Sequence, residues 1–259
     1  MNGHHNSEGL PTVPVIDFGP WDNSDKQEER LKVARELTAA CRNVGFVQII
    51  NHGLPDDVLQ EAFAWSKKLF DLPMEQKMLA PHPDGPNVHR GYSYPGLEKV
   101  GQVNGTNGDD SKAEEALRQV TDCKESYEIG SSECEEQPNV WLPEDVLPGY
   151  RDFMSSFYWR CDAIAKSLLR AMTLDYLKST MHRVTLPPLS DRFVGDQRIT
   201  RERYSIPYFV APDSDAVVEC LPSCMGEGNP AKYEPVNWAS YRRMRAKLQY
   251  QSQPATVEA

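Results

Sequence analysis

The sequence predicts an α+β fold, in which a helical and mixed N-terminal region precedes a strand-rich C-terminal part. Two long segments, 27–44 and 148–172, carry apolar residues at three- and four-residue steps, the period of an amphipathic helix. From residue 182 onward the apolar residues gather instead in short runs bounded by proline, which is typical of strands. We therefore expect one region over 1–178 and a second over 179–259.

The N-terminal region alternates strands and helices. Glycine, proline and asparagine mark the points where one predicted element ends and the next begins. The predicted elements are a strand at 13–18, a helix at 27–44 that Gly45 ends, a strand at 46–50, a turn at 51–53, a helix at 55–70 and a short helix that begins at Pro73.

A second set of elements fills the rest of the chain. The stretch Leu79–Asp110 is rich in proline, glycine, asparagine and aspartate, which predicts a long surface excursion. The remaining predicted elements are a strand at 124–129, the long helix at 148–172, strands at 182–186, 203–210 and 216–221, and a closing helix at 238–250.

Composition restricts the partners that the chain is expected to have. A formal net charge of −10 opposes a phosphate backbone, so we expect a small-molecule substrate and no nucleic-acid partner. No apolar run has the length of a membrane span and no secretory signal is recognised, so the cytoplasm is the expected location and no membrane partner is expected. The six cysteines are scattered without a C-x-x-C pair, which favours reduced thiols.

Several motifs together resemble one enzyme family. The N-terminal motifs are V-I-D-F at 15–18, G-F-V-Q-I-I-N-H-G at 45–53, H-R-G-Y-S at 89–93 and D-C-K-E-S-Y-E-I-G at 122–130. The C-terminal ones are S-T-M-H-R-V-T-L-P-P at 179–188 and R-Y-S-I-P-Y-F at 203–209. The chain resembles the isopenicillin N synthase-like, fungal-type 2-oxoglutarate- and Fe(II)-dependent dioxygenases over nearly its whole length.

The resemblance implies a fold, two cofactors and three site residues. The fold is a non-haem dioxygenase N-terminal region followed by a double-stranded β-helix, or jelly roll. The cofactors are Fe(II), held on one face by two histidines and a carboxylate, and 2-oxoglutarate, whose oxidative decarboxylation drives oxidation of a small organic molecule, as in specialised metabolite biosynthesis. His182 matches the distal iron histidine, and Arg203 and Ser205 match the pair that holds the distal carboxylate of 2-oxoglutarate.

The sequence departs from the family where its H-x-D iron ligands belong. Leu174–Lys178 runs directly into Ser179–His182, so the resemblance implies a jelly roll that is incomplete and lacks its central segment. Exposed strand edges should then favour self-association. A gene model that omits coding sequence, a decayed paralogue and a shortened non-catalytic protein all explain this departure.

Three functions remain open on the sequence alone. The first is an oxygenase of the family type, and the second is a catalytically inactive form with at most a binding role. The third is a metal-binding module on the loop that carries His82, Asp84 and His89, because imidazoles and a carboxylate are common metal ligands. The string His82-Pro83-Asp84 has the H-x-D pattern but lies far before the predicted jelly roll.

Overall fold

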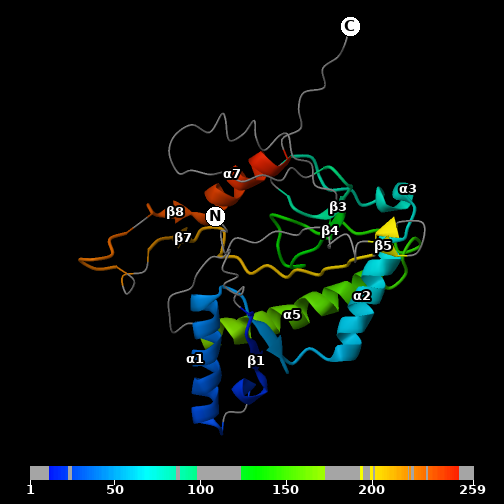
Figure 1. Cartoon of the computed structure of the whole chain (residues 1–259). Helices are drawn as coiled ribbons and strands as arrows, with labels where there is room; N and C mark the ends of the chain where they lie inside the picture. The colour runs from blue at the N-terminus through cyan, green and yellow to red at the C-terminus, as the bar shows by residue number, and fades with distance from the viewer. Residues whose placement is uncertain are drawn as a thin grey trace, which may run out of the picture. The chain divides into compact units, whose positions relative to one another are not determined.

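The chain forms two compact units in the computed structural model (Figure 1). Unit 1 comprises 1–60 and 160–207, and unit 2 comprises 61–159 and 208–259. The structure describes residues 12–22, 25–85, 88–97, 124–172, 193–194, 199–200, 202–220, 222, 225–231 and 233–250. The domain boundary expected between residues 178 and 179 lies outside the described residues and stays a prediction.

Unit 1 is built around a short parallel ladder between β1 (Val15–Asp17) and β2 (Gln48–Ile50). Between these strands the chain forms the 3-10 helix η1 (Gly19–Asp22) and helix α1 (Gln27–Asn43). Parallel strands need such a crossover, and α1 lies beside the two strands in Figure 1. The predictions of a strand, a helix and a second strand over 13–50 are therefore confirmed.

The apolar stripe of α1 is the face that packs against the ladder. Its side chains join the strand residues and the end of helix α5 (Tyr150–Met172) in one buried cluster: Ile16, Phe18, Val33, Leu37, Ala40 and Ala171. Trp21 packs on this cluster and its indole N–H donates a 3.0 Å hydrogen bond to Ser167 Oγ. Burial of each large apolar side chain contributes about 1.5–3 kcal/mol, so this cluster stabilises unit 1.

Asp17 closes the end of the ladder by binding the turn that follows β2. Its Oδ1 atom accepts hydrogen bonds of 2.9 Å from the side-chain amide of Asn51 and from the backbone N–H of Gly19. Asn51 has a positive φ of 53°, a conformation that asparagine tolerates better than most residues. These hydrogen bonds lower the pKa of Asp17. The predicted turn at 51–53 is confirmed.

Unit 2 contains one antiparallel ladder close to the candidate site and a second near the C-terminal helix. The first pairs β3 (Gly91–Ser93) with β4 (Ser126–Glu128), and the second pairs β7 (Val217–Val218) with β8 (Val236–Asn237). Helices α2 (Asp56–Phe70) and α5 contribute to both units. Unit 2 also contains the helices α3 (Met74–Lys77) and α7 (Trp238–Tyr250). Unit 1 also contains the antiparallel pair β5 (Phe193–Val194) and β6 (Ile199–Thr200).

An aromatic cluster supports the first ladder of unit 2. The ring of Tyr150, at the start of α5, lies edge-on to Trp65, Tyr127 and Trp141 at centroid distances of 5.7 to 6.1 Å. The Tyr127 hydroxyl donates a 2.6 Å hydrogen bond to the carbonyl of Val140. Burial raises the pKa of both Tyr127 and Tyr150, so both phenols stay neutral at physiological pH. The long helix and the strand predicted at 124–129 are confirmed.

Two predictions on local structure are wrong. Arg203–Val210 is irregular rather than a strand, and Pro207 cannot donate a ladder hydrogen bond there. The surface excursion predicted for Leu79–Asp110 is wrong at β3, whose three residues are buried, and its part over 98–110 lies outside the described residues. The strand predicted at 216–221 is confirmed only as the two residues of β7, and the strand at 182–186 lies outside the described residues.

Two further expectations concern membrane-spanning helices and the state of the cysteines. No helix among the described residues is both long and apolar enough to cross a bilayer. The four cysteines within the described ranges are free thiols, as expected: Cys41, Cys134, Cys161 and Cys220.

Replacing Leu37 by alanine should lower the free energy of unfolding by about 2–5 kcal/mol, because the side chain is 0% exposed and its removal leaves a cavity. Leu31→Ala is the matched control on the same helix, since Leu31 is 39% exposed, and it should cost about 1 kcal/mol or less. Urea denaturation followed by circular dichroism measures both. Equal losses for the two variants would contradict the assignment of the buried face.

Candidate functional site

The candidate site lies at one end of the β3–β4 ladder. The two strands run antiparallel with Gly91 opposite Glu128. They belong to the H-R-G-Y-S and D-C-K-E-S-Y-E-I-G motifs on which the family resemblance rests. Pairing therefore brings the residues just before β3 next to the last residue of β4.

Gly91 allows the segment Ala80–His82 to run alongside β3. Its φ is +80°, and a Cβ atom there would lie 2.7 Å from the carbonyl oxygen of Ala80, so only glycine fits. The backbone N–H of Tyr92 donates to Ala80 at 2.7 Å, and that of His82 donates to the Tyr92 carbonyl at 2.8 Å. This close approach holds His82 beside the ladder.

A buried polar group lies behind β3. Lys77 Nζ donates a 2.8 Å hydrogen bond to Glu125 Oε2 and a 3.0 Å hydrogen bond to the carbonyl of Phe70. The Tyr92 hydroxyl donates to the same Glu125 oxygen. Burial and this hydrogen bond raise the pKa of Tyr92, which therefore stays protonated. Each buried polar atom of the trio has a partner, so the group supports the ladder structurally.

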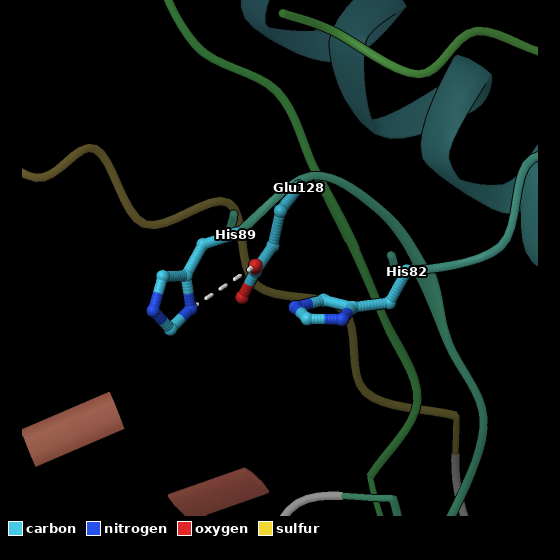
Figure 2. Close-up of side chains that lie close together, drawn as sticks. All are labelled: His82, His89 and Glu128. Atoms are coloured by element: carbon cyan, nitrogen blue, oxygen red, sulfur yellow. Dashed lines mark ion pairs between the residues drawn. The ribbon is translucent and has the colours of Figure 1, made fainter. Parts of the chain in front are cut away.

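His82, His89 and Glu128 converge at the end of the ladder (Figure 2). Each offers one ligand atom, and these atoms lie within 4.8 Å of one another. His89 Nδ1 is 3.9 Å from Glu128 Oε2, and the two imidazole rings lie nearly perpendicular with centroids 5.9 Å apart. All three residues are partly buried. Among the His, Cys, Asp and Glu side chains of the described residues, these three have ligand atoms close enough together to hold a metal ion.

Hydrogen bonds hold both histidines in place, through the backbone of His89 and through the ring of His82. His89 N–H donates to Gln137 Oε1 at 3.2 Å, and the His89 carbonyl accepts from Arg90 Nη1 at 2.6 Å. His82 Nδ1 lies 2.7 Å from the carbonyl oxygen of Pro83. A carbonyl can only accept, so Nδ1 carries the proton when the ring is neutral, and Nε2 presents a lone pair.

Arg90 is a charged residue that interacts electrostatically with this cluster through Glu128. Its Nη1 atom donates to the His89 carbonyl and, at 3.3 Å, to Gln137 Oε1, and a Cβ atom at Gly130 would overlap its guanidinium. Burial lowers the pKa of Arg90, while Glu128 and other neighbours act in the opposite direction. The guanidinium nevertheless stays protonated, because arginine is not deprotonated in proteins. Its charge partly offsets that of Glu128.

The structure brings together two of the three residues of the third sequence hypothesis, the metal-binding module. That hypothesis grouped His82 and His89 with Asp84, but Asp84 is exposed and Glu128 takes the third place. Glu128 was missed because it is 39 residues from His89 in sequence and becomes its neighbour only through the β3–β4 register. The single local signal was the predicted strand over 124–129, which did not reveal its partner.

The three residues that the family resemblance assigns to the cofactors remain predictions. Arg203 and Ser205 are both exposed and lie in the irregular segment before Tyr208. His182 lies outside the described residues. The only H-x-D string in the sequence is His82-Pro83-Asp84, and its Asp84 does not join the cluster. The family's iron ligands therefore do not fit the residues present.

Comparison with known proteins identifies the family to which this chain belongs. Residues 13–144, half of the chain, match the family described as non-haem dioxygenase in morphine synthesis N-terminal. The chain belongs to this non-haem dioxygenase N-terminal family, which confirms the resemblance found in the sequence. The match contains both strands of the candidate site's ladder.

Individual relatives agree with this family. The 2-oxoglutarate-dependent dioxygenase frbA of Dothideomycetidae sp. is 35% identical over 62% of this chain and 46% of its own length. Proline hydroxylase buaE of Petromyces alliaceus is 42% identical over 53% of this chain and 40% of its own length. The chain spans about half the length of the curated relatives it matches.

A solved structure shows a similar fold. It is the full-length Neurospora crassa protein in complex with alpha-KG and thymine, which matches with a TM-score of 0.66 and 23% identity over 93% of this chain and 98% of that chain. At this identity the likeness concerns the fold alone. The two proteins therefore share a mixed helix-and-sheet architecture.

Glu125→Gln should lower the free energy of unfolding by about 3–5 kcal/mol, because it leaves the buried charge of Lys77 without its counter-ion. Asp71→Asn is the control, since Lys67 and Asp71 form an exposed ion pair on the surface, and it should cost about 0.5 kcal/mol or less. Denaturant unfolding measures both. A neutral effect of Glu125→Gln would show that the trio does not support the ladder.

Proposed function

We propose that the protein is a 2-oxoglutarate- and Fe(II)-dependent oxidoreductase that acts on a small organic molecule in specialised metabolite biosynthesis. The observation that carries this proposal is the β3–β4 ladder, which joins two family motifs inside the segment matched by the family. The names of the relatives, a 2-oxoglutarate-dependent dioxygenase and a proline hydroxylase, support the co-substrate and the class of reaction. The substrate itself depends on side chains that differ between members.

Arg203 and Ser205 are proposed to hold the distal carboxylate of 2-oxoglutarate. A guanidinium donates two parallel hydrogen bonds to a carboxylate, and a neighbouring hydroxyl adds a third donor. Both residues are exposed and are thus accessible to a dicarboxylate. Bound iron would supply the activation of oxygen, and His182 is the residue of this chain proposed to contact it.

The 259-residue chain is proposed to be a shortened form of the enzyme with an incomplete jelly roll. Four apolar side chains support this, since Phe209 is 85% exposed and Val210, Val217 and Val218 are exposed as well. In a closed barrel, many apolar side chains face a packed interior. Within the described residues, the two-residue strands β7 and β8 pair with each other alone, and such open edges favour self-association.

A non-catalytic role is the second candidate. It is favoured by the direct connection of Leu174–Lys178 to Ser179–His182, which leaves no room for the H-x-D ligands. In that case the N-terminal region would act as an interaction surface, with weak dicarboxylate binding at Arg203 and Ser205. Sequencing the transcript across codons 174 to 182 separates the candidates, because an enzyme requires the additional coding segment there.

The chain of 259 residues should not couple 2-oxoglutarate consumption to substrate oxidation, since it lacks the H-x-D ligands. The measurement is succinate release in the presence of Fe(II), ascorbate and O₂. A form encoded with the additional segment serves as the positive control. Robust release by the short chain that His182→Ala abolishes would show that other residues complete the iron site.

In a form that contains the additional segment, Arg203→Ala should raise the 2-oxoglutarate concentration needed for half-maximal rate about 30-fold or more, because loss of a charge-assisted pair costs about 2–5 kcal/mol. The KM for the organic substrate should change much less. Arg151→Ala, at an exposed position of α5, is the control and should leave both values unchanged. An unaltered 2-oxoglutarate dependence in Arg203→Ala would remove this residue from the site.

A further inference from the structure

Two imidazoles and one carboxylate meet at the end of the β3–β4 ladder in unit 2. Histidine nitrogen and carboxylate oxygen are the ligands that divalent transition metals accept together, and His₂Glu is one of the sets found at zinc sites. We propose that His82, His89 and Glu128 bind one divalent transition-metal ion of the zinc class. The site uses neither His182 nor Arg203 and Ser205, so it goes beyond the proposed oxidoreductase function.

The geometry requires only a small closure around the ion. The three ligand atoms lie within 4.8 Å of one another, and His89 Nδ1 is 3.9 Å from Glu128 Oε2. In a tetrahedral site with metal–ligand distances of about 2.0–2.2 Å, ligand atoms lie about 3.4 Å apart. The ligand atoms therefore have to approach by about 1 Å, and all three side chains already face one another (Figure 2).

The hydrogen bond of His82 favours metal ligation. Ligating histidines usually donate their second ring N–H to a carbonyl or carboxylate, which fixes the tautomer and the orientation of the ring. The 2.7 Å contact between His82 Nδ1 and the Pro83 carbonyl has this form. It directs Nε2, a solvent-shielded atom, toward the cluster.

The backbone positions of the ligands are also set before an ion binds. His82 N–H is bonded to the carbonyl of Tyr92 in β3, and Glu128 lies opposite Gly91 in the same ladder. His89 is held from both sides by Gln137 and Arg90. Little backbone ordering therefore remains for the ion to impose, and this increases affinity.

The ligand set selects the class of ion. Mg²⁺ and Ca²⁺ prefer sites made of oxygen atoms, and Cu(I) prefers thiolates, so neither class suits two imidazoles. Among the remaining divalent ions, Zn²⁺ binds more tightly than Fe²⁺ or Mn²⁺ at a given nitrogen and oxygen site. The nearby Arg90 guanidinium lowers the affinity without removing a ligand. Three protein ligands leave a further position for water.

The alternative explanation of the cluster is an ion pair between a protonated His89 and Glu128, with His82 packed beside it. Both explanations account for the 3.9 Å separation. They differ in the response to metal, because an ion pair has no need of His82 Nε2 and gives no stoichiometric binding. Titration with metal therefore separates them.

The test is a titration of the chelator-treated full chain with Zn²⁺, in competition with a chromophoric chelator and in the presence of a non-chelating reductant. We expect one tight site per chain and a rise in the unfolding temperature, since an ion that binds only the folded state stabilises it. Titration with Co²⁺ should produce visible d–d absorption, a readout that does not depend on any enzymatic activity.

Variants assign the site to the three residues. His82→Ala and the conservative Glu128→Gln should each weaken Zn²⁺ binding about tenfold or more, since loss even of a residue that only orients a ligand costs about 10–100-fold. Asp84→Asn is the matched control, because Asp84 is exposed on the same loop and lies outside the cluster, and it should bind as the parent does. Circular dichroism shows whether each variant is folded.

A second control removes His4 and His5 together, since two adjacent imidazoles are a competing pair of zinc ligands, and it should retain the tight site. Three results would overturn the proposal. They are the absence of micromolar Zn²⁺ binding by the parent chain, unchanged binding in folded Glu128→Gln, and a loss in Asp84→Asn as large as that in His82→Ala. The last result would instead assign the ion to the H-x-D string.

Discussion

The approach of Ala80 and Pro81 to β3 at Gly91 is the constraint on which the candidate site depends. A side chain at this position would collide with backbone carbonyl oxygens, and a positive φ would strain any other residue. With glycine present, the chain forms backbone hydrogen bonds on both sides of Tyr92. The same ladder then sets Glu128 opposite Gly91 and so brings it to the two histidines.

The family motifs of the N-terminal region therefore have two kinds of role in this chain. Gly91, Tyr92 and Glu125 shape and support the ladder, because they provide the close approach and the buried polar group with Lys77. His89 and Glu128 lie at the end of the same ladder and are two of the three proposed metal ligands. A single strand pairing thus serves both stability and the proposed metal site, and a change in register would remove both.

The sequence predicted the helices of this structure well and its strand pairing poorly. The α1 and α5 stripes are local patterns, and each was predicted within a few residues of its observed ends. Pairing of β3 with β4 joins residues more than 30 positions apart, and no local pattern encodes such a contact. For this reason β3 was expected in a surface excursion, and the metal-binding hypothesis grouped the two histidines with Asp84 and did not include Glu128. Arg203–Val210 has strand-like composition but, in the described structure, no ladder partner.

The most direct test of the proposed metal site is a crystal structure of the zinc-loaded chain with anomalous diffraction recorded at the zinc absorption edge. We predict one strong anomalous peak within bonding distance of His82 Nε2, a ring nitrogen of His89 and a carboxylate oxygen of Glu128, at about 2.0–2.2 Å from each. Gly91 should lie opposite Glu128 in the same map. A peak held by other side chains, or a ladder in which these three residues lie apart, would contradict it.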